Sequence, residues 1–120
     1  MHGLEQAARE LLNRNWRAGT YRGREYAFSV PSPRSYPWQW YWDSCFAAIA
    51  WRRFDPSRSR AELETLLAAA RSDGFIGHTI FWGHRIDWQR AVRYNVNTCS
   101  DLTTQTIQPP LLDRLAEALA

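Results

Sequence analysis

Residues 35–45 read SYPWQWYWDSC, and this aromatic stretch marks the point where the central helix of the chain should begin. Trp38, Trp40 and Trp42 alternate along it, and Asp43 follows at once. The apolar residues that come next recur every three or four positions, which is the spacing of one helix face. We therefore predict a helix from about Trp40 to Arg53. Its apolar stripe would consist of Trp42, Phe46, Ile49 and Ala50.

On the N-terminal side of this stretch the sequence predicts one helix and one long loop. Residues 4–15, LEQAARELLNRN, are rich in helix formers and place apolar residues at helical spacing. Between Trp16 and Pro37 several glycines and prolines interrupt any regular pattern, and Ser-Pro pairs favour turns or extended chain. We expect a long irregular loop there. Long ordered loops often carry function.

On the C-terminal side the pattern predicts a third helix. Ser59 and Glu62 have the S-x-x-E spacing of a capping box, in which the hydroxyl and the carboxylate each satisfy a backbone amide at a helix start. The turn signal Asp73-Gly74 should end this helix near Ser72. Its apolar face would consist of Leu63, Leu66, Leu67 and Ala70.

The remaining third of the chain shows less order. Residues 75–102 have no sustained period, so we expect an irregular excursion with short strands around residues 75–81. A fourth helix should open near Pro109, because proline is tolerated in a first helical turn. Helices joined by elaborate loops, with the last running to the final residue, indicate one part of a larger helical assembly, truncated at its C-terminus.

Composition places the chain among single globular domains and argues against several classes of function. Its 120 residues include 45% hydrophobic and 22% charged side chains, so disorder is not expected. The net charge is +3, but all 15 basic residues are arginines spread along the chain, which is typical of a solvated surface rather than of a nucleic-acid interface.

Cysteine spacing and hydropathy lead to further negative expectations. Cys45 and Cys99 lack the spacing of metal ligands, so we expect buried free thiols, no metal and no cofactor. The sequence shows neither an apolar signal segment nor a membrane-spanning run. We therefore expect a cytoplasmic protein that has no membrane partner.

The aromatic stretch has the composition of a carbohydrate site. Indole rings cover the C–H faces of a sugar, and a carboxylate accepts strong hydrogen bonds from its hydroxyl rim. Trp40, Trp42 and Asp43 at a helix start, with Tyr36 in the preceding loop, would suit this task. On pattern alone a structural role is favoured, because Trp42 shares a stripe with expected core residues and a first-turn aspartate stabilises the helix dipole.

A family resemblance favours the sugar site. Residues 36–82, together with the segment TIQPPLL at 106–112, resemble the N-terminal part of glycoside hydrolase family 63 enzymes, in particular the mannosylglycerate and glucosylglycerate hydrolases of bacteria. The resemblance implies an all-α fold, the N-terminal portion of an (α/α)6 barrel with long irregular loops. It also implies an inverting mechanism that uses two carboxyl groups separated by room for a water molecule.

The resemblance assigns recognition, rather than catalysis, to this chain. Both catalytic carboxylates of the family lie beyond the matching part, so no catalytic residue is expected here. Trp42 and Asp43 would line the subsite of the nonreducing sugar, with Asp43 accepting hydrogen bonds from its hydroxyls. Tyr36, Trp40 and Gln108 would close the pocket or reach the glycerate moiety, and His78 is a further candidate whose alternative is a structural histidine.

Three functions follow for testing. The first is the N-terminal segment of a glycosidase acting on a small anionic sugar glycoside, which is completed by the rest of the barrel or by self-association. The second is a noncatalytic carbohydrate-binding module, and the third is a basic nucleic-acid-binding protein.

Overall fold

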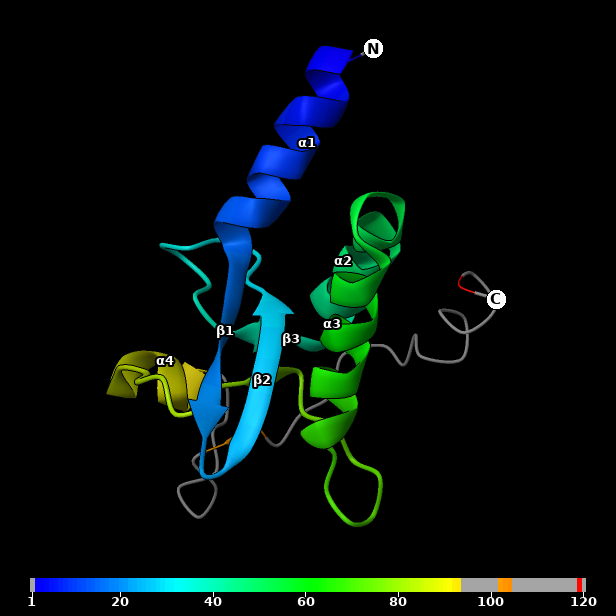
Figure 1. The fold of residues 1–120 in the computed structure, drawn as a ribbon. Coiled ribbons are helices and arrows are strands. Elements are labelled where there is room, and N and C mark those ends of the chain that lie inside the picture. Colours follow the sequence, from blue (N-terminus) through cyan, green and yellow to red (C-terminus); the bar gives the residue numbers. More distant parts are fainter. Residues whose placement is uncertain (1, 94–101, 105–118, 120) are drawn as a thin grey trace.

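The computed structural model describes residues 2–93, 102–104 and 119. Five elements lead up to and include the central helix: α1 (His2–Asn15), β1 (Trp16–Tyr21), β2 (Arg24–Ser29), β3 (Gln39–Trp40) and α2 (Tyr41–Phe54). Three follow it: α3 (Pro56–Ala68), β4 (Thr79–Ile80) and α4 (Trp88–Arg93). In Figure 1, α2 and α3 lie side by side next to the β1–β2 hairpin, while α1 extends away from the body of the molecule.

The segment after α1 is a β-hairpin, so the prediction of a loop from residue 16 onward is wrong for its first half. β1 and β2 pair antiparallel from Trp16 opposite Ser29 to Tyr21 opposite Arg24. Arg22 and Gly23 form the turn with φ values of 50° and 78°, and such a pair of positive φ angles matches the twist of a hairpin. Only residues 30–38 form the expected irregular connection, with one isolated bridge.

Two short strands hold the start of α2 in place. β3 pairs antiparallel with β4, with Gln39 opposite Ile80 and Trp40 opposite Thr79. Ile80 forms a further bridge to Thr103, which brings a third segment to the same small sheet. The short strands expected around residues 75–81 are thereby confirmed, whereas the short helix α4 was not predicted.

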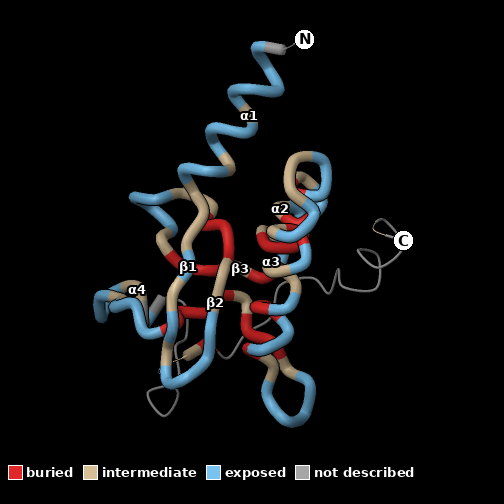
Figure 2. The backbone as a smooth tube through the Cα atoms, in the orientation of Figure 1, coloured by how far each residue is buried: buried red, intermediate tan, exposed pale blue. Residues whose placement is uncertain are grey.

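The predicted helix over residues 40–53 is confirmed as α2, but its buried face is a different one. The predicted stripe residues Trp42, Phe46 and Ile49 are 40%, 57% and 44% exposed. The opposite face is buried and mixes polar with apolar residues: Tyr41, Ser44, Cys45, Ala48 and Trp51. Figure 2 shows the buried positions of α2 and α3 gathered in the middle of the molecule, next to the hairpin.

α3 begins three residues before the expected capping box. Asp55 is its N-cap, since the Asp55 carboxylate accepts from the backbone amides of Ser57 and Arg58, and Pro56 fills the first turn. The capping-box prediction is therefore wrong. Ser59 instead donates to the carbonyl of Ala48 on α2 at 2.6 Å. Glu62 is fully buried.

Glu62 was predicted at a helix start because spacing alone cannot distinguish a cap from a buried polar contact between helices. The predicted apolar face of α3 is also only partly buried. Leu66 is fully buried, whereas Leu67 is 55% exposed.

The described part of the chain thus combines helices with two two-stranded sheets, so the expectation of an all-α fold is corrected. β-branched and aromatic residues in Thr20–Tyr21 and Tyr26–Val30 favour strands, and they outweigh the glycines that suggested a loop. The fourth helix expected from Pro109 lies outside the described residues.

Candidate functional site

Three aromatic rings meet where β3 leads into α2. The ring centres of Tyr36 and Trp40 are 5.5 Å apart in an edge-to-face arrangement, and those of Trp40 and His78 are also 5.5 Å apart. Tyr36 is 45% exposed, so this row of rings reaches the surface. We refer to these residues together with Trp42 and Asp43 as the aromatic corner.

The β3–β4 pairing brings two distant segments together in the aromatic corner. Tyr41 donates its backbone amide to the carbonyl of His78 at 2.9 Å, which ties the first residue of α2 to the residue before β4. The His78 ring is in turn held by a 3.0 Å hydrogen bond between Nδ1 and Oγ1 of Thr104. His78 therefore has both the structural bond of the alternative interpretation and a place beside Trp40.

Asp43 and Trp42 form the helical side of the aromatic corner. Asp43 lies in the first turn of α2, as predicted, and is only half-buried. Burial raises the pKa of the Asp43 carboxyl above its usual value, while hydrogen bonds from its own backbone amide and from the Trp42 side chain oppose that rise. A half-buried carboxylate with an indole beside it can accept hydrogen bonds from a polar ligand.

The neighbouring indole does not belong to this surface. Trp38 is 2% exposed, packs edge to face on Phe81 and donates from Nε1 to the carbonyl of Arg85 at 3.4 Å. Of the predicted site residues, the structure thus brings Tyr36, Trp40 and His78 into contact and pairs Trp42 with Asp43. Gln108 lies outside the described residues.

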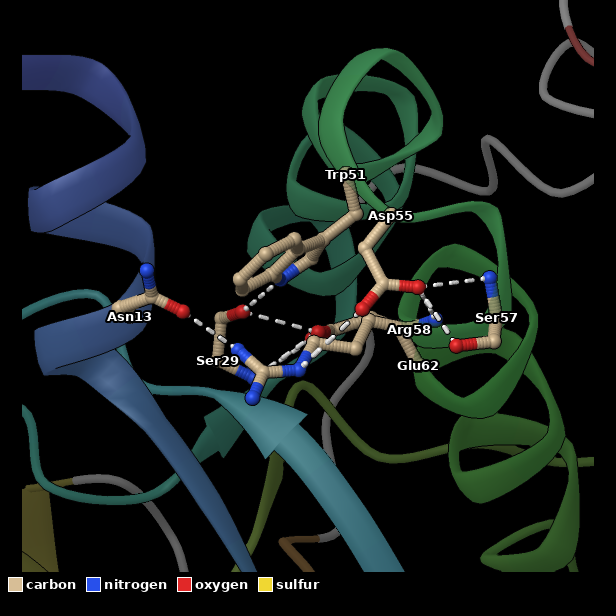
Figure 3. A network of polar contacts seen from close by, with 7 residues as sticks. All are labelled: Asn13, Ser29, Trp51, Asp55, Ser57, Arg58 and Glu62. Carbon is tan, nitrogen blue, oxygen red and sulfur yellow. Dashed lines mark hydrogen bonds and ion pairs between the residues drawn. The ribbon is translucent and has the colours of Figure 1, made fainter. Parts of the chain in front are cut away.

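A buried carboxylate beneath the aromatic corner escaped the sequence analysis. Glu62 of α3 is fully buried and accepts from the backbone amide and hydroxyl of Ser29, each at 2.9 Å, and from the Ser44 hydroxyl at 2.8 Å. Figure 3 shows Glu62 between Ser29 and the α3 backbone, with Trp51 above Ser29. Burial raises the pKa of Glu62 to about 7 although these hydrogen bonds oppose it.

The signal that could have found Glu62 was present in the sequence. Ser59, Glu62, Leu66 and Ala69 recur at helical spacing and form one face, and all are buried. Cys45 lies on the facing side of α2 as a buried free thiol, as predicted, and desolvation together with the Glu62 charge raises its pKa to about 11. Cys99 lies outside the described residues.

The described residues contain neither a cluster of metal ligands nor a membrane-crossing helix. Within them, no three side chains of His, Cys, Asp or Glu gather in the manner of metal ligands. None of their helices has the length and apolar character needed to cross a membrane.

Comparisons with known proteins agree on one family. The model of the mannosylglycerate hydrolase MGH1-like glycoside hydrolase domain matches residues 36–120, which is more than half of the chain. The chain is 33% identical over 111 residues to the mannosylglycerate hydrolase of Thermus thermophilus, covering 86% of this chain and 24% of that protein. It is 33% identical over 91 residues to the glucosylglycerate hydrolase of Mycolicibacterium hassiacum, covering 69% of this chain and 20% of that protein.

A solved structure gives the same result. The crystal structure of a GH63 mannosylglycerate hydrolase from Thermus thermophilus, in complex with Tris and D-glycerate, matches with a TM-score of 0.56 and 36% identity. The match covers 71% of this chain and 19% of that one, so the chain spans about a quarter or less of its relatives. These matches favour the glycosidase interpretation over the binding-module and nucleic-acid alternatives. The chain belongs to the mannosylglycerate hydrolase-like enzymes of glycoside hydrolase family 63.

Proposed function

We propose that this chain is the N-terminal segment of an inverting α-glycosidase that hydrolyses mannosylglycerate or glucosylglycerate. Its part is to recognise the sugar. The observation that carries this proposal is the aromatic corner, where the half-buried Asp43 accepts a hydrogen bond from Trp42 and follows, three residues on, the Trp40 of a row of three rings. The names of the relatives supply the substrate class.

The chemistry of the aromatic corner suits a hexose. The exposed ring of Tyr36 and the indole of Trp42 offer flat apolar surfaces for C–H groups, while the Asp43 carboxylate accepts from vicinal hydroxyls. Ionised Asp43 is the competent form, because a carboxylate accepts hydrogen bonds at both oxygens. Its raised pKa keeps the proton on Asp43 over a wider acidic range than for a free aspartate.

The other three aspartates among the described residues already have structural tasks, which favours recognition over catalysis for this segment. Asp55 caps α3, and Asp73 accepts from the backbone amide of Phe75 at 3.0 Å. Asp87 accepts from the amide of Arg90 at 2.8 Å at the start of α4. We propose that the acid and base of the inverting reaction come from chain beyond these residues.

We also propose that the segment is part of an (α/α)6 barrel and that the exposed stripe of α2 packs against further helices of it. Phe46 and Ile49 are large, exposed apolar side chains along one helix face, one and two turns beyond Trp42 at the sugar-binding end. An exposed apolar stripe of this kind is typical of an interface. Association of the 120-residue chain with itself is the alternative occupant, and Phe46→Glu distinguishes the two. This substitution should restore a monomer if self-association occurs, and it should destabilise a full-length barrel if further helices cover the stripe.

A chimera tests the function directly. This chain replaces the aligned segment of the Thermus thermophilus mannosylglycerate hydrolase, and hydrolysis of both glycosides is measured. Asp43→Ala should lower kcat/KM about 10- to 100-fold, since it removes hydrogen bonds to a charged group. Glu64→Ala on the exposed face of α3 is the matched control and should leave kcat/KM unchanged. If a folded, active chimera treats the two substitutions alike, the assignment of Asp43 is wrong.

A further inference from the structure

A chain of buried hydrogen bonds runs from Trp82, just after β4, to α3 directly beneath the aromatic corner. Trp82 donates from Nε1 to Oε1 of Gln39 at 2.7 Å. Gln39 donates from Nε2 to the Ser44 hydroxyl at 3.0 Å, and Ser44 donates to Oε1 of Glu62 at 2.8 Å. Gln39, Ser44 and Glu62 are all 0% exposed, so water does not compete for these bonds.

A second arm reaches the same carboxylate from the hairpin. Trp51 donates from Nε1 to the Ser29 hydroxyl at 2.9 Å, and Ser29 donates to Oε2 of Glu62 at 2.9 Å (Figure 3). The Ser29 backbone amide also points at both carboxylate oxygens, 2.9 Å from each. We call the six residues of both arms the Glu62 network: Ser29, Gln39, Ser44, Trp51, Glu62 and Trp82.

The donors in this network all point toward Glu62. An indole N–H can only donate, so Trp82 and Trp51 fix the direction at the outer end of each arm. Each serine hydroxyl accepts from the outer side and directs its own proton inward. The arrangement is complete only if Glu62 is an acceptor at both oxygens, which is the ionised state. A proton on Glu62 adds a donor where two hydroxyl donors already converge.

The longer arm passes through the backbone that carries the aromatic corner. Gln39 is the residue before Trp40, and Ser44 is the residue after Asp43. Both lie on the inner side of the chain, while Trp40 and Asp43 lie on the outer side with greater exposure. The 3.0 Å hydrogen bond from Gln39 Nε2 to the Ser44 hydroxyl therefore fixes β3 against the first turn of α2 on the buried side of the chain.

We propose that Glu62 is the positioning residue of the aromatic corner: through Ser44 and Gln39 its carboxylate sets the relative placement of Asp43 and Trp40. This inference rests on the proposed sugar-binding function and adds a regulation to it. Glu62 has no exposed surface and is not a catalytic residue. A proton on Oε1 removes the acceptor of the Ser44 hydroxyl, loosens the Gln39 bond and allows the two binding residues to move apart.

The surroundings of Glu62 allow its carboxyl to gain and lose a proton near neutral pH. The pKa of Glu62 is raised to about 7 by burial. On α2, Cys45 remains a neutral thiol because its own pKa is about 11, and Asp43 lies one residue from Ser44. On α3, the Arg58 guanidinium lies 4.8 Å from the centre of the Trp51 ring. The hairpin and β3 contribute the uncharged Ser29 and Gln39.

Nuclear magnetic resonance on the 120-residue chain tests the coupling without any sugar. The indole signals of Trp51 and Trp82 and the backbone amides of Trp40 and Asp43 should shift together with one midpoint near pH 7. Glu62→Gln should abolish that midpoint and leave the separate titration of Asp43. If the indoles report the midpoint while the amides of Trp40 and Asp43 stay still, Glu62 is structural only and the proposal is wrong.

Ser44→Ala distinguishes the two arms of the network, and it provides a second test if the Glu62→Gln variant does not fold. It removes the arm to the aromatic corner and keeps the Ser29 arm. The Trp51 indole signal should then still follow the Glu62 titration, with a midpoint above that of the parent because the Ser44 bond lowers the Glu62 pKa, whereas the amide of Trp40 should lose its response. An unchanged response of Trp40 would overturn the proposed route. Isotope-labelled tryptophan allows the same signals to be followed in the chimera.

The chimera adds a functional readout. Glu62→Gln should lower kcat/KM about 10-fold or more at pH values above 7, mainly by raising KM, and should flatten the pH profile around pH 7. Glu64→Gln, on the exposed side of the same helix, should change neither. If the parent chimera cleaves neither glycoside, the proposed function fails, while the resonance experiment still decides whether Glu62 positions Trp40 and Asp43.

Discussion

The Arg58 guanidinium lies over the indole of Trp51, 4.8 Å from the centre of the ring. It also lies 5.0 Å from the centre of Trp16, and the two indoles meet edge to face at 5.5 Å. Nη1 of Arg58 donates to Oδ1 of Asn13 at 2.6 Å (Figure 3). One side chain of α3 thus joins the end of α1, the start of β1 and the last turns of α2.

Arg58→Ala should lower the free energy of unfolding by about 1–2 kcal/mol, because it removes a partly buried cation that contacts both indoles. Arg58→Lys should restore only part of this stability, since a lysine cannot stack as a planar group. Urea denaturation measures the effect. Arg60→Ala is the control, because its exposed ion pair with Glu64 contributes little. Equal losses for Arg58→Ala and Arg60→Ala would contradict the role of the stack.

Glu62 should make the chain less stable as the pH rises from about 4.5 to about 7. Its folded pKa lies above its ordinary value of 4.5, so the folded state holds the proton more tightly than the unfolded state does. The contribution is complete below pH 4.5 and disappears by pH 7, a difference of roughly 3 kcal/mol. Denaturation series at several pH values should show this slope in the parent and not in Glu62→Gln. The slope persisting in the variant would assign it to another group.

Gly19→Ala should destabilise the hairpin. A Cβ there would lie 2.5 Å from the Tyr26 hydroxyl and 2.7 Å from its ring, and Tyr26 stacks on Trp82 at 5.6 Å, so it cannot move freely. We expect a loss of about 1–3 kcal/mol in thermal or urea unfolding. Gly3→Ala in α1 is the matched control, with open space around it, and should be neutral or slightly stabilising. A neutral Gly19→Ala would show that Tyr26 rearranges at no cost.

The Cys45 thiol should resist modification in the folded chain. It is 1% exposed, and burial together with the Glu62 charge raises its pKa to about 11, so little thiolate forms at neutral pH. A Cys99→Ser variant isolates Cys45, and a thiol-specific reagent should label it only after addition of urea. Rapid labelling under native conditions would mean that α2 and α3 separate readily.

The three long helices could be predicted from sequence, but their orientations could not. α1 and α2 follow from helix-forming runs and begin and end close to the predicted positions. The buried face of α2 was mistaken because periodicity marks apolar residues, and here Trp42, Phe46 and Ile49 are the exposed ones. Ser44 is buried instead because Glu62 accepts its hydrogen bond, a partner 18 residues away that no local pattern contains.

The hairpin and the site illustrate the same limit at different ranges. Gly19 and Gly23 suggested a loop, although one makes room for a ring on the facing strand and the other completes a two-residue turn. The aromatic corner residues were found as neighbours in sequence, and the pairing of β3 with β4 adds His78. Glu62 was assigned to a helix cap because the sequence cannot tell which partner its carboxylate has.

Substitutions on the two faces of α2 should affect folding of this chain and activity of the whole enzyme differently. A mutational scan that scores only folding of the 120 residues should be sensitive at Ser44, Ala48 and Trp51 and tolerant at Phe46 and Ile49. The same scan scored by growth on a glycoside, in an enzyme of the relatives' length, should find both faces intolerant. The difference between the two maps would outline, residue by residue, the surface on α2 that the proposed further helices would cover.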